Sequence, residues 1–423
     1  MKKISLFVVF YFLFQTLCST LSAQINTSPY SKLGIGLTTG PALINNMGMG
    51  GLGISNGNGL HINNVNPALL YKNNLTSFDA AFASEINNLS NSEETKQTVK
   101  GGLSYVAVAF PVIPLRWTFS VGLMPYSTVG YSITESRSVE GSDEATVADL
   151  NATGSGGITQ VYLSNGVKIF NNFSLGLKAA FLFGSIVDET SFILDLPPPN
   201  YKSTLEERVT FSDVVFTPAA HYSLKFGQNT FLNMGVTYQP KTSVSAEGFT
   251  SLQRRSPVTD LPIGTDTLTE ESGKVTLPTQ YGFGISLEKP LKYTIGVDLQ
   301  LFNWSEFRNF NGDHDNMQNS YKISFGGELI PDISSIDSYF KRMQYRIGGS
   351  YQLYPFTINN QQISGYSLNF GASFPVFNFS SLNLAVEYGE RGTTQNELIK
   401  ESYFQIHIGA TFNDRWFVRR RFD

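Results

Sequence analysis

The chain has almost no cysteine and few charged side chains. Its 423 residues contain one cysteine, Cys18, and charged residues make up 15% of the sequence, against about 25% in typical soluble proteins. A disulfide framework and a cysteine metal site are therefore excluded. The formal net charge of −4 gives no basic footprint for nucleic acid. The shortage of charge in a long chain indicates a surface that does not face water alone.

Long apolar runs are missing too, except at the N-terminus. Lys2 and Lys3 precede the apolar run 4–17, and small residues then lead to Ala23. This pattern predicts a secretory signal peptide over residues 1–23. The alternatives are a lipoprotein modified at Cys18 and an uncleaved anchor helix. Because no further run reaches the roughly 18 apolar residues of a membrane helix, a soluble exported all-β protein and an outer-membrane barrel remain.

From Thr76 onward, apolar and small or polar residues alternate with a period of two. In the stretch 293–301, Tyr293, Ile295 and Val297 share one face, whereas Thr294 and Asp298 lie on the other. This is the periodicity of β-strands. About fourteen such segments follow one another between residues 76 and 413, so we predict an all-β fold.

The connections between these segments alternate between two classes. Short connections rich in turn residues, such as 111–115, 170–172 and 289–290, take turns with long polar ones, such as 85–100, 135–154 and 248–272. Outer-membrane barrels have tight periplasmic turns and long external loops. The aromatic content of 13% fits their interfacial girdles. We therefore predict a transmembrane, antiparallel, up-and-down β-barrel of about fourteen strands over residues 76–413.

The stretch 34–70 contains nine glycines but also many apolar residues. So much glycine disfavours an ordinary helix or strand, and the apolar residues require an enclosing wall. A barrel of about fourteen strands encloses more space than its own side chains fill. We therefore predict that residues 24–75 form an N-terminal hatch in the lumen.

Several short motifs resemble the FadL-type family of outer-membrane long-chain fatty-acid and hydrophobic-compound transporters. They are Asn66-Pro67-Ala68 at the end of the glycine-rich segment, Pro125-Tyr126 in the third strand, Leu277-Pro278 before Tyr281-Gly282-Phe283-Gly284, Phe302-Asn303-Trp304-Ser305-Glu306-Phe307, and Tyr345-Arg346-Ile347-Gly348. The resemblance spans most of the chain after the signal peptide.

This resemblance implies a monomeric barrel in the outer membrane of a Gram-negative bacterium that takes up hydrophobic molecules, such as long-chain fatty acids, by diffusion. It implies that ligand leaves sideways into the bilayer through a gap beside a kinked third strand, here at Pro125 and Tyr126. The residues expected to hold the hatch are Gly50, Gly53, Asn66, Pro67 and Ala68. Independently of the family, Pro125 removes a ladder donor from its strand, which is equally compatible with a bulge that only adjusts curvature.

The C-terminal end, residues 414–423, is basic and aromatic. Trp416, Arg419, Arg420 and Arg421 could contact phosphate-bearing lipid or a partner protein. This end motivates an alternative function, an accessory subunit of an outer-membrane secretion or barrel-assembly complex. No serine is marked as partner to a histidine, and the loop around His314 lacks regularly spaced oxygen ligands. We therefore expect no enzyme activity, no cofactor and no metal.

Overall fold

The computed structural model describes residues 28–138, 147–194, 201–377 and 380–416. The predicted signal peptide, the alternatives at Cys18 and the arginines Arg419, Arg420 and Arg421 lie outside these residues. Within them, no helix has the length and apolar character needed to cross a membrane.

Most of the described chain is β-strand. The long strands are β2 (Thr76–Ser90), β3 (Thr95–Ile113), β4 (Trp117–Ser138), β5 (Val147–Phe170), β6 (Phe173–Leu194), β7 (Lys202–Lys225), β8 (Phe231–Gln239), β9 (Thr242–Arg255), β10 (Pro262–Leu277), β11 (Gln280–Lys289), β12 (Tyr293–Phe302), β13 (Ser320–Leu329), β14 (Gln344–Ile358), β15 (Gln361–Phe377), β16 (Ser380–Arg391) and β17 (Lys400–Asp414). The short elements are η1 (Pro29–Lys32), β1 (Leu37–Thr38), α2 (Ile44–Met47), η2 (Pro67–Lys72), η3 (Trp304–Glu306), α3 (Tyr339–Arg342) and η4 (Gln395–Glu397).

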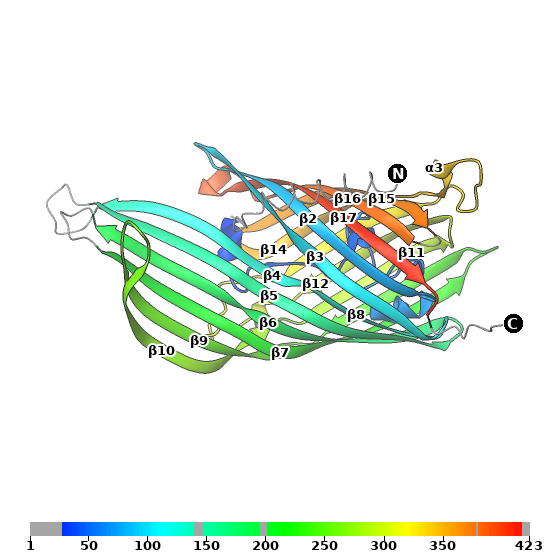
Figure 1. Cartoon of the computed structure of the whole chain (residues 1–423), viewed down its shortest axis with the longest axis horizontal. Helices are drawn as coiled ribbons and strands as arrows, with labels where there is room; N and C mark the ends of the chain where they lie inside the picture. The colour runs from blue at the N-terminus through cyan, green and yellow to red at the C-terminus, as the bar shows by residue number, and fades with distance from the viewer. Residues whose placement is uncertain (1–27, 139–146, 195–200, 378–379, 417–423) are drawn as a thin grey trace, which may run out of the picture.

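The long strands form one closed antiparallel barrel (Figure 1). The last strand, β17, pairs with the first, β2, from Lys400 opposite Ser90 to Asp414 opposite Thr76. β8 and β9 are two parts of one wall strand, and so are β10 and β11, because β8 pairs with β11 and β9 with β10. The wall therefore has 14 strands among the described residues. The predicted fold class, an up-and-down β-barrel, is confirmed.

The two faces of the wall differ in chemistry, as the alternation predicts. Exposed large apolar side chains cover the outside; they include Phe82, Leu163, Phe181, Phe216, Ile285, Val297, Phe325, Ile347, Leu368 and Ile408. Buried polar side chains line the inside; they include Ser164, His221, Asn233, Asp298, Glu328, Arg346, Asn369 and Thr411. An apolar exterior around a polar interior is the arrangement of a barrel that crosses the outer membrane.

Both ends of the wall, Thr76 and Asp414, lie at the end that carries the short turns. This is the periplasmic end by the usual rule for such barrels. At the other end, β4 to β7, β9 and β10 project well beyond their neighbours (Figure 1). Much of the sequence predicted as long loops, including 85–90 and 248–255, is paired strand there. Strands can extend there because their side chains are polar on both faces, and cross-strand pairs of polar side chains stabilise such strands in water.

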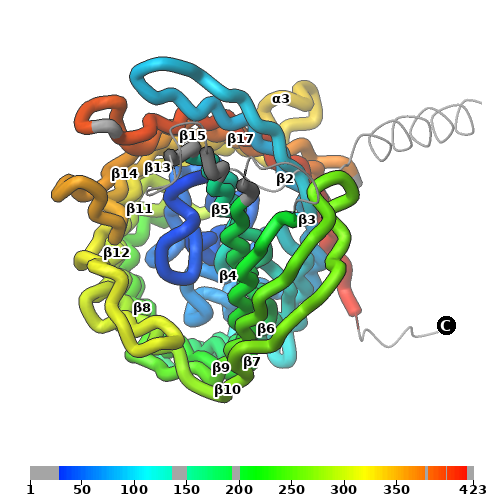
Figure 2. The backbone as a smooth tube through the Cα atoms, turned by 90° about the vertical axis from the view of Figure 1, so that its left-hand side faces the viewer, coloured from blue at the N-terminus to red at the C-terminus, as the bar shows by residue number. Residues whose placement is uncertain are grey.

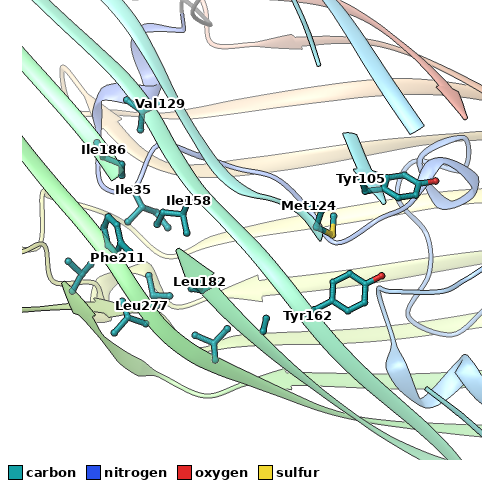
Figure 3. Packing of buried hydrophobic residues seen from close by; sticks show 14 of the residues in the cluster. Ile35, Tyr105, Met124, Val129, Ile158, Tyr162, Leu182, Ile186, Phe211 and Leu277 are labelled. Carbon is teal, nitrogen blue, oxygen red and sulfur yellow. The ribbon is translucent and has the colours of Figure 1, made fainter. Parts of the chain in front are cut away.

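A cluster of buried apolar side chains lies between the N-terminal residues and the inner face of β4 to β7 (Figure 3). Ile35 packs in the same cluster as Ile158, Leu182 and Phe211. Burial of apolar surface stabilises by about 25 cal/mol per Å², so this cluster holds residues 30–44 against one side of the wall.

Candidate functional site

Residues 28–75, called here the lumenal segment, lie inside the ring of strands (Figure 2). Near its start, the backbone N–H of Ser28 donates to the carbonyl oxygen of Gly130 at 2.9 Å, in the external half of β4. At its end, η2 contacts β5 and β6 near their periplasmic ends. The segment therefore runs along the lumen from the external half to the periplasmic end. Whether it acts as a movable hatch stays a prediction.

Wall glycines let the backbone of the lumenal segment approach closely. A Cβ atom at Gly235 would overlap the carbonyl oxygen of Ile54, and one at Gly348 would overlap the backbone of Met49. Gly176 stands in the same relation to the backbone of Ala68. At these three positions the missing side chain leaves space for the backbone of the lumenal segment to lie against the wall.

Asn66, Pro67 and Ala68 lie at the N-terminus of η2 and are buried. The side chain of Asn66 accepts a hydrogen bond from the backbone N–H of Ala68 at 2.9 Å, which caps the short helix. Its amide group donates to the carbonyl oxygen of Ile54 at 2.6 Å and to that of Ala220 in β7 at 3.3 Å. Asn66 thus connects two parts of the lumenal segment with the wall.

Gly50 and Gly53 lie where the segment meets β12 to β14. Gly50 has a φ of +72° and no room for a Cβ beside the backbone of Gly349. The backbone N–H groups of Gly53 and Ile54 both donate to Oδ2 of Asp298 at 2.8 Å. A buried carboxylate that accepts two backbone N–H groups is a strong, charge-assisted attachment.

A buried polar network joins the segment to β13 and β14. Nε2 of His61 lies 2.9 Å from Oε1 of Gln344, and the guanidinium of Arg346 donates to that same oxygen. Arg346 also forms an ion pair with Glu328 at 2.6 Å, and the amide of Asn58 donates to Glu328 at 3.1 Å. Burial, with the nearby charge of Arg346, lowers the pKa of His61 to about 3, so this imidazole is neutral at physiological pH.

Near the external end, Glu401 of β17 holds the start of the segment. Its carboxylate accepts a hydrogen bond from the Ser28 hydroxyl at 2.6 Å and pairs with Arg391 at 2.7 Å. The Arg391 guanidinium lies over the rings of Tyr354 and Tyr403, 5.2 and 5.8 Å from their centroids. Because Glu401 is fully buried, this ion pair is shielded from solvent.

The wall is interrupted between β3 and β4. The described pairing of these strands runs from Ile113 opposite Trp117 up to Val106 opposite Leu123 and goes no further. Just beyond, Tyr126 forms a bulge in β4, because Pro125 faces Thr159 of β5 and Ser127 faces Ile158. We call this interruption the seam.

The lumenal segment occupies the edge of β4 that β3 leaves. β1 pairs with it, Leu37 opposite Thr128 and Thr38 opposite Ser127, and the backbone N–H of Thr39 donates to the carbonyl oxygen of Tyr126 at 2.9 Å. Pro125 and Tyr126 therefore lie where β4 exchanges one partner strand for another.

A cavity of about 390 Å³ lies in the lumen beside the seam. On the seam side it is lined by residues 101–104 of β3 and by Pro125 and Thr128 of β4. The apolar side chains of Leu37 and Met47 share its wall with charged ones, Glu85, Lys100, Lys322, Glu387 and Arg391. Its mixed lining suits a molecule with both an apolar and a polar part.

Solved structures with the same fold are transporters and channels. The Ralstonia pickettii toluene transporter TbuX is 15% identical, with 89% of this chain and 98% of that chain covered and a TM-score of 0.56. A Pseudomonas aeruginosa FadL homologue is 14% identical, with 90% and 99% covered and a TM-score of 0.56. The Pseudomonas putida toluene transporter TodX is 14% identical, with 91% and 100% covered and a TM-score of 0.53. The predicted resemblance to FadL-type barrels is thus confirmed for the fold.

A family model described as BamG matches residues 1–423. The chain belongs to the BamG family. No curated protein matches it in sequence.

Trp416 of this BamG-family barrel lies beside the β3–β4 turn. The half-exposed ring of Trp416 lies 5.7 Å from that of Phe110, which in turn stacks on Phe119 at 5.2 Å. A cleft of about 930 Å³ opens here, lined mainly by apolar residues and by Arg415. The predicted contact of Trp416 with lipid or a partner stays a prediction.

Sequence reasoning missed the polar side chains that fix the lumenal segment in this BamG-family chain, notably Asp298, Glu328, Arg346 and Glu401. A signal was present, because each is a charged residue on the inward face of a strand whose other face is apolar. Charges at such positions need a partner, and the glycine-rich segment supplies several of them.

Proposed function

We propose that this barrel is an outer-membrane channel for the uptake of hydrophobic molecules, long-chain fatty acids or similar compounds. One observation carries the proposal: a cavity with apolar and charged walls lies against an interruption of the barrel wall. Solute would enter from the external end, bind in the cavity and leave sideways through the seam at Pro125 and Tyr126. The transporters and channels that share the fold support the same reading.

In this proposal, the lumenal segment is the hatch. Gly50, Gly53, Asn66, Pro67 and Ala68 hold it to the wall, and β1 closes the seam from the inside. Apolar parts of the solute bind by burial, about 0.8 kcal/mol per CH₂. Solute can pass sideways only when β1 leaves the edge of β4.

A disulfide between β1 and β4 tests the route. Thr38 and Ser127 are opposite each other, and with Cys18 removed in the signal peptide the exported chain has no other thiol. We expect cells with the Thr38→Cys/Ser127→Cys barrel to take up a fluorescent long-chain fatty acid as slowly as a deletion strain, and reductant to restore uptake. A matched disulfide between β9 and β10, Ser243→Cys/Thr276→Cys, away from the cavity, should leave uptake unchanged. Equal uptake by the wild-type and deletion strains would refute the channel.

A second function, an accessory subunit of an outer-membrane secretion or barrel-assembly complex, is favoured by how firmly the lumen is filled. Buried wall carboxylates hold the lumenal segment at three levels: Glu401 accepts from Ser28, Asp298 from Gly53 and Glu328 from Asn58. Such attachments suit a static plug better than a moving one. Extraction in mild detergent separates the two functions, because a channel that acts alone runs as a monomer and a subunit brings partners in fixed ratio.

A further inference from the structure

The external half of β3 has an open edge. Its residues 95–105 pair with β2 on one side, whereas among the described strands the pairing with β4 stops at Val106 and Leu123. Ser104 is unmatched at a bulge between Tyr105 and Leu103, so β3 bends away from β4 at the level where β4 bends at Tyr126. The edge is therefore about eleven residues long.

Open strand edges are costly in and near a membrane. Lipid cannot satisfy the backbone N–H and C=O groups of an unpaired strand, and a long exposed edge is a template for another strand.

The side chains of this edge alternate as they do in a membrane wall strand. Val99 and Leu103 face outward with exposed fractions of 49% and 42%. They continue the apolar surface of Ile86 and Phe82, their partners in β2. On the inner face Lys100 forms an ion pair with Glu85 at 2.9 Å, and Lys96 lies on the same face.

We propose that the open edge of β3 pairs with an extended membrane strand of another outer-membrane protein. The proposal rests on the second function above, and it names the surface and the chemistry of the partner. The partner strand is apolar toward lipid and carries acidic or other polar side chains toward the lumen, opposite Lys96 and Lys100. Main-chain hydrogen bonds supply affinity and the alternating side chains supply specificity.

Two other occupants fit less well. A second copy paired antiparallel about Lys100 would place two lysines directly opposite each other, which is unfavourable. The lumenal segment of the same chain already pairs with β4 through β1. If cleavage follows Ala23, only four residues precede Ser28, too few to cover the edge.

Site-specific photo-crosslinking in intact cells tests the proposal. A photoreactive amino acid is placed at Val99 or at Leu103, and, as a matched control, at Leu368 or Phe370, which face outward from the fully paired strand β15. We expect a discrete adduct from the β3 positions alone. Peptide mapping should place the attachment in a membrane strand of a different outer-membrane protein, at residues spaced by two.

Proline scanning supplies a second test, which compares the adduct yields of two variants. Prolines at Thr98 and Val99 remove backbone donors that point to opposite sides of β3. The proline that removes a donor to β2 should impair barrel folding, as judged by heat-modifiable migration. The other should fold normally and lower the adduct yield about tenfold, the effect of losing one main-chain hydrogen bond to the partner strand.

Adducts to lipid, to β4, to the lumenal segment or to a second copy would overturn the proposal. So would an adduct whose yield is unchanged by the well-folded proline variant. If partners co-purify in fixed ratio but no adduct forms at the β3 edge, this proposal fails while the subunit function stands. If nothing co-purifies, the subunit function fails with it.

Discussion

Oδ2 of Asp298, in the barrel wall, accepts a hydrogen bond from the backbone N–H of Gly53, in the lumenal segment, at 2.8 Å. The N–H of Ile54 donates to the same oxygen at the same distance. A side chain of β12 therefore satisfies two backbone donors of a segment that has no secondary structure at this point to satisfy them.

Replacing Asp298 should loosen the lumenal segment. In Asp298→Ala two buried N–H groups lose their acceptor, at about 1 to 3 kcal/mol for each group. We expect a lower free energy of unfolding in urea and faster proteolysis within residues 28–75. Asp298→Asn keeps an acceptor oxygen and should lie between that variant and the wild type.

Ser286→Ala is the matched control for Asp298. Ser286 is also buried on the inner face of this part of the wall, and its hydroxyl makes no hydrogen bond within the described residues. Its removal should change stability by less than about 1 kcal/mol. Equal effects of Asp298→Ala and Ser286→Ala would contradict the role assigned to Asp298.

The stability of the barrel should depend on pH through His61. Its pKa is about 3 in the folded protein, below the value of about 6.5 for an exposed imidazole. As pH falls from 6.5 toward 3, the unfolded chain binds a proton that the folded chain does not. Stability should therefore fall by up to about 1.4 kcal/mol per pH unit from this group.

Comparison with His61→Gln isolates this contribution. Carboxylates titrate equally in both proteins, so the difference between their stabilities, measured by urea unfolding from pH 7 to pH 4, reports on His61. The wild type should lose stability more steeply on acidification. Parallel pH profiles would show that His61 titrates normally and is not held in its buried site.

Gly235 should tolerate no side chain. In Gly235→Ala the new methyl group would overlap the carbonyl oxygen of Ile54, and such overpacking costs about 1 to 3 kcal/mol. Gly102→Ala is the control, since open space surrounds that position in β3. We expect a lower unfolding temperature for the first variant only, measured by heat-modifiable migration.

The two ion pairs formed by β16 with β17 residues should differ sharply in strength. Arg391→Met leaves the fully buried Glu401 without its cation, which costs about 3 to 5 kcal/mol. Lys400→Met breaks the more exposed pair with Glu390, which costs less than about 1 kcal/mol. Adding Glu401→Gln to Arg391→Met should recover part of the loss in urea unfolding. Failure to recover any would show that packing on Tyr354 and Tyr403 matters more than charge.

The sequence predicts the wall well because each strand carries its own signal. Alternation such as that of Tyr293, Ile295 and Val297 opposite Asp298 follows from the two-residue repeat of a strand. The predicted strands are observed, but several extend further at the external end than predicted, into 85–90 and 248–255. The position of Pro125 indicated an irregular place in β4, and the interruption begins beside it.

The local sequence pattern could not reveal which residues and strands contact one another. Nothing near Asp298 or Arg346 in the chain points to Gly53 or His61, because the contacts join residues hundreds of positions apart. Nor could the pattern show that β1 would replace β3 beside β4. Those pairings depend on closure of the whole barrel, which no window of sequence contains.

The hydrogen bond between Ser28 and Glu401 spans 373 positions of the chain, and this separation bears on how the barrel assembles. Residues 28–75 are synthesised before the wall strands, but the hydrogen bond from Ser28 to Glu401 can form only once β17 is in place. Contacts of such long separation form slowly. We therefore expect the wall to close around a lumenal segment that already lies inside it.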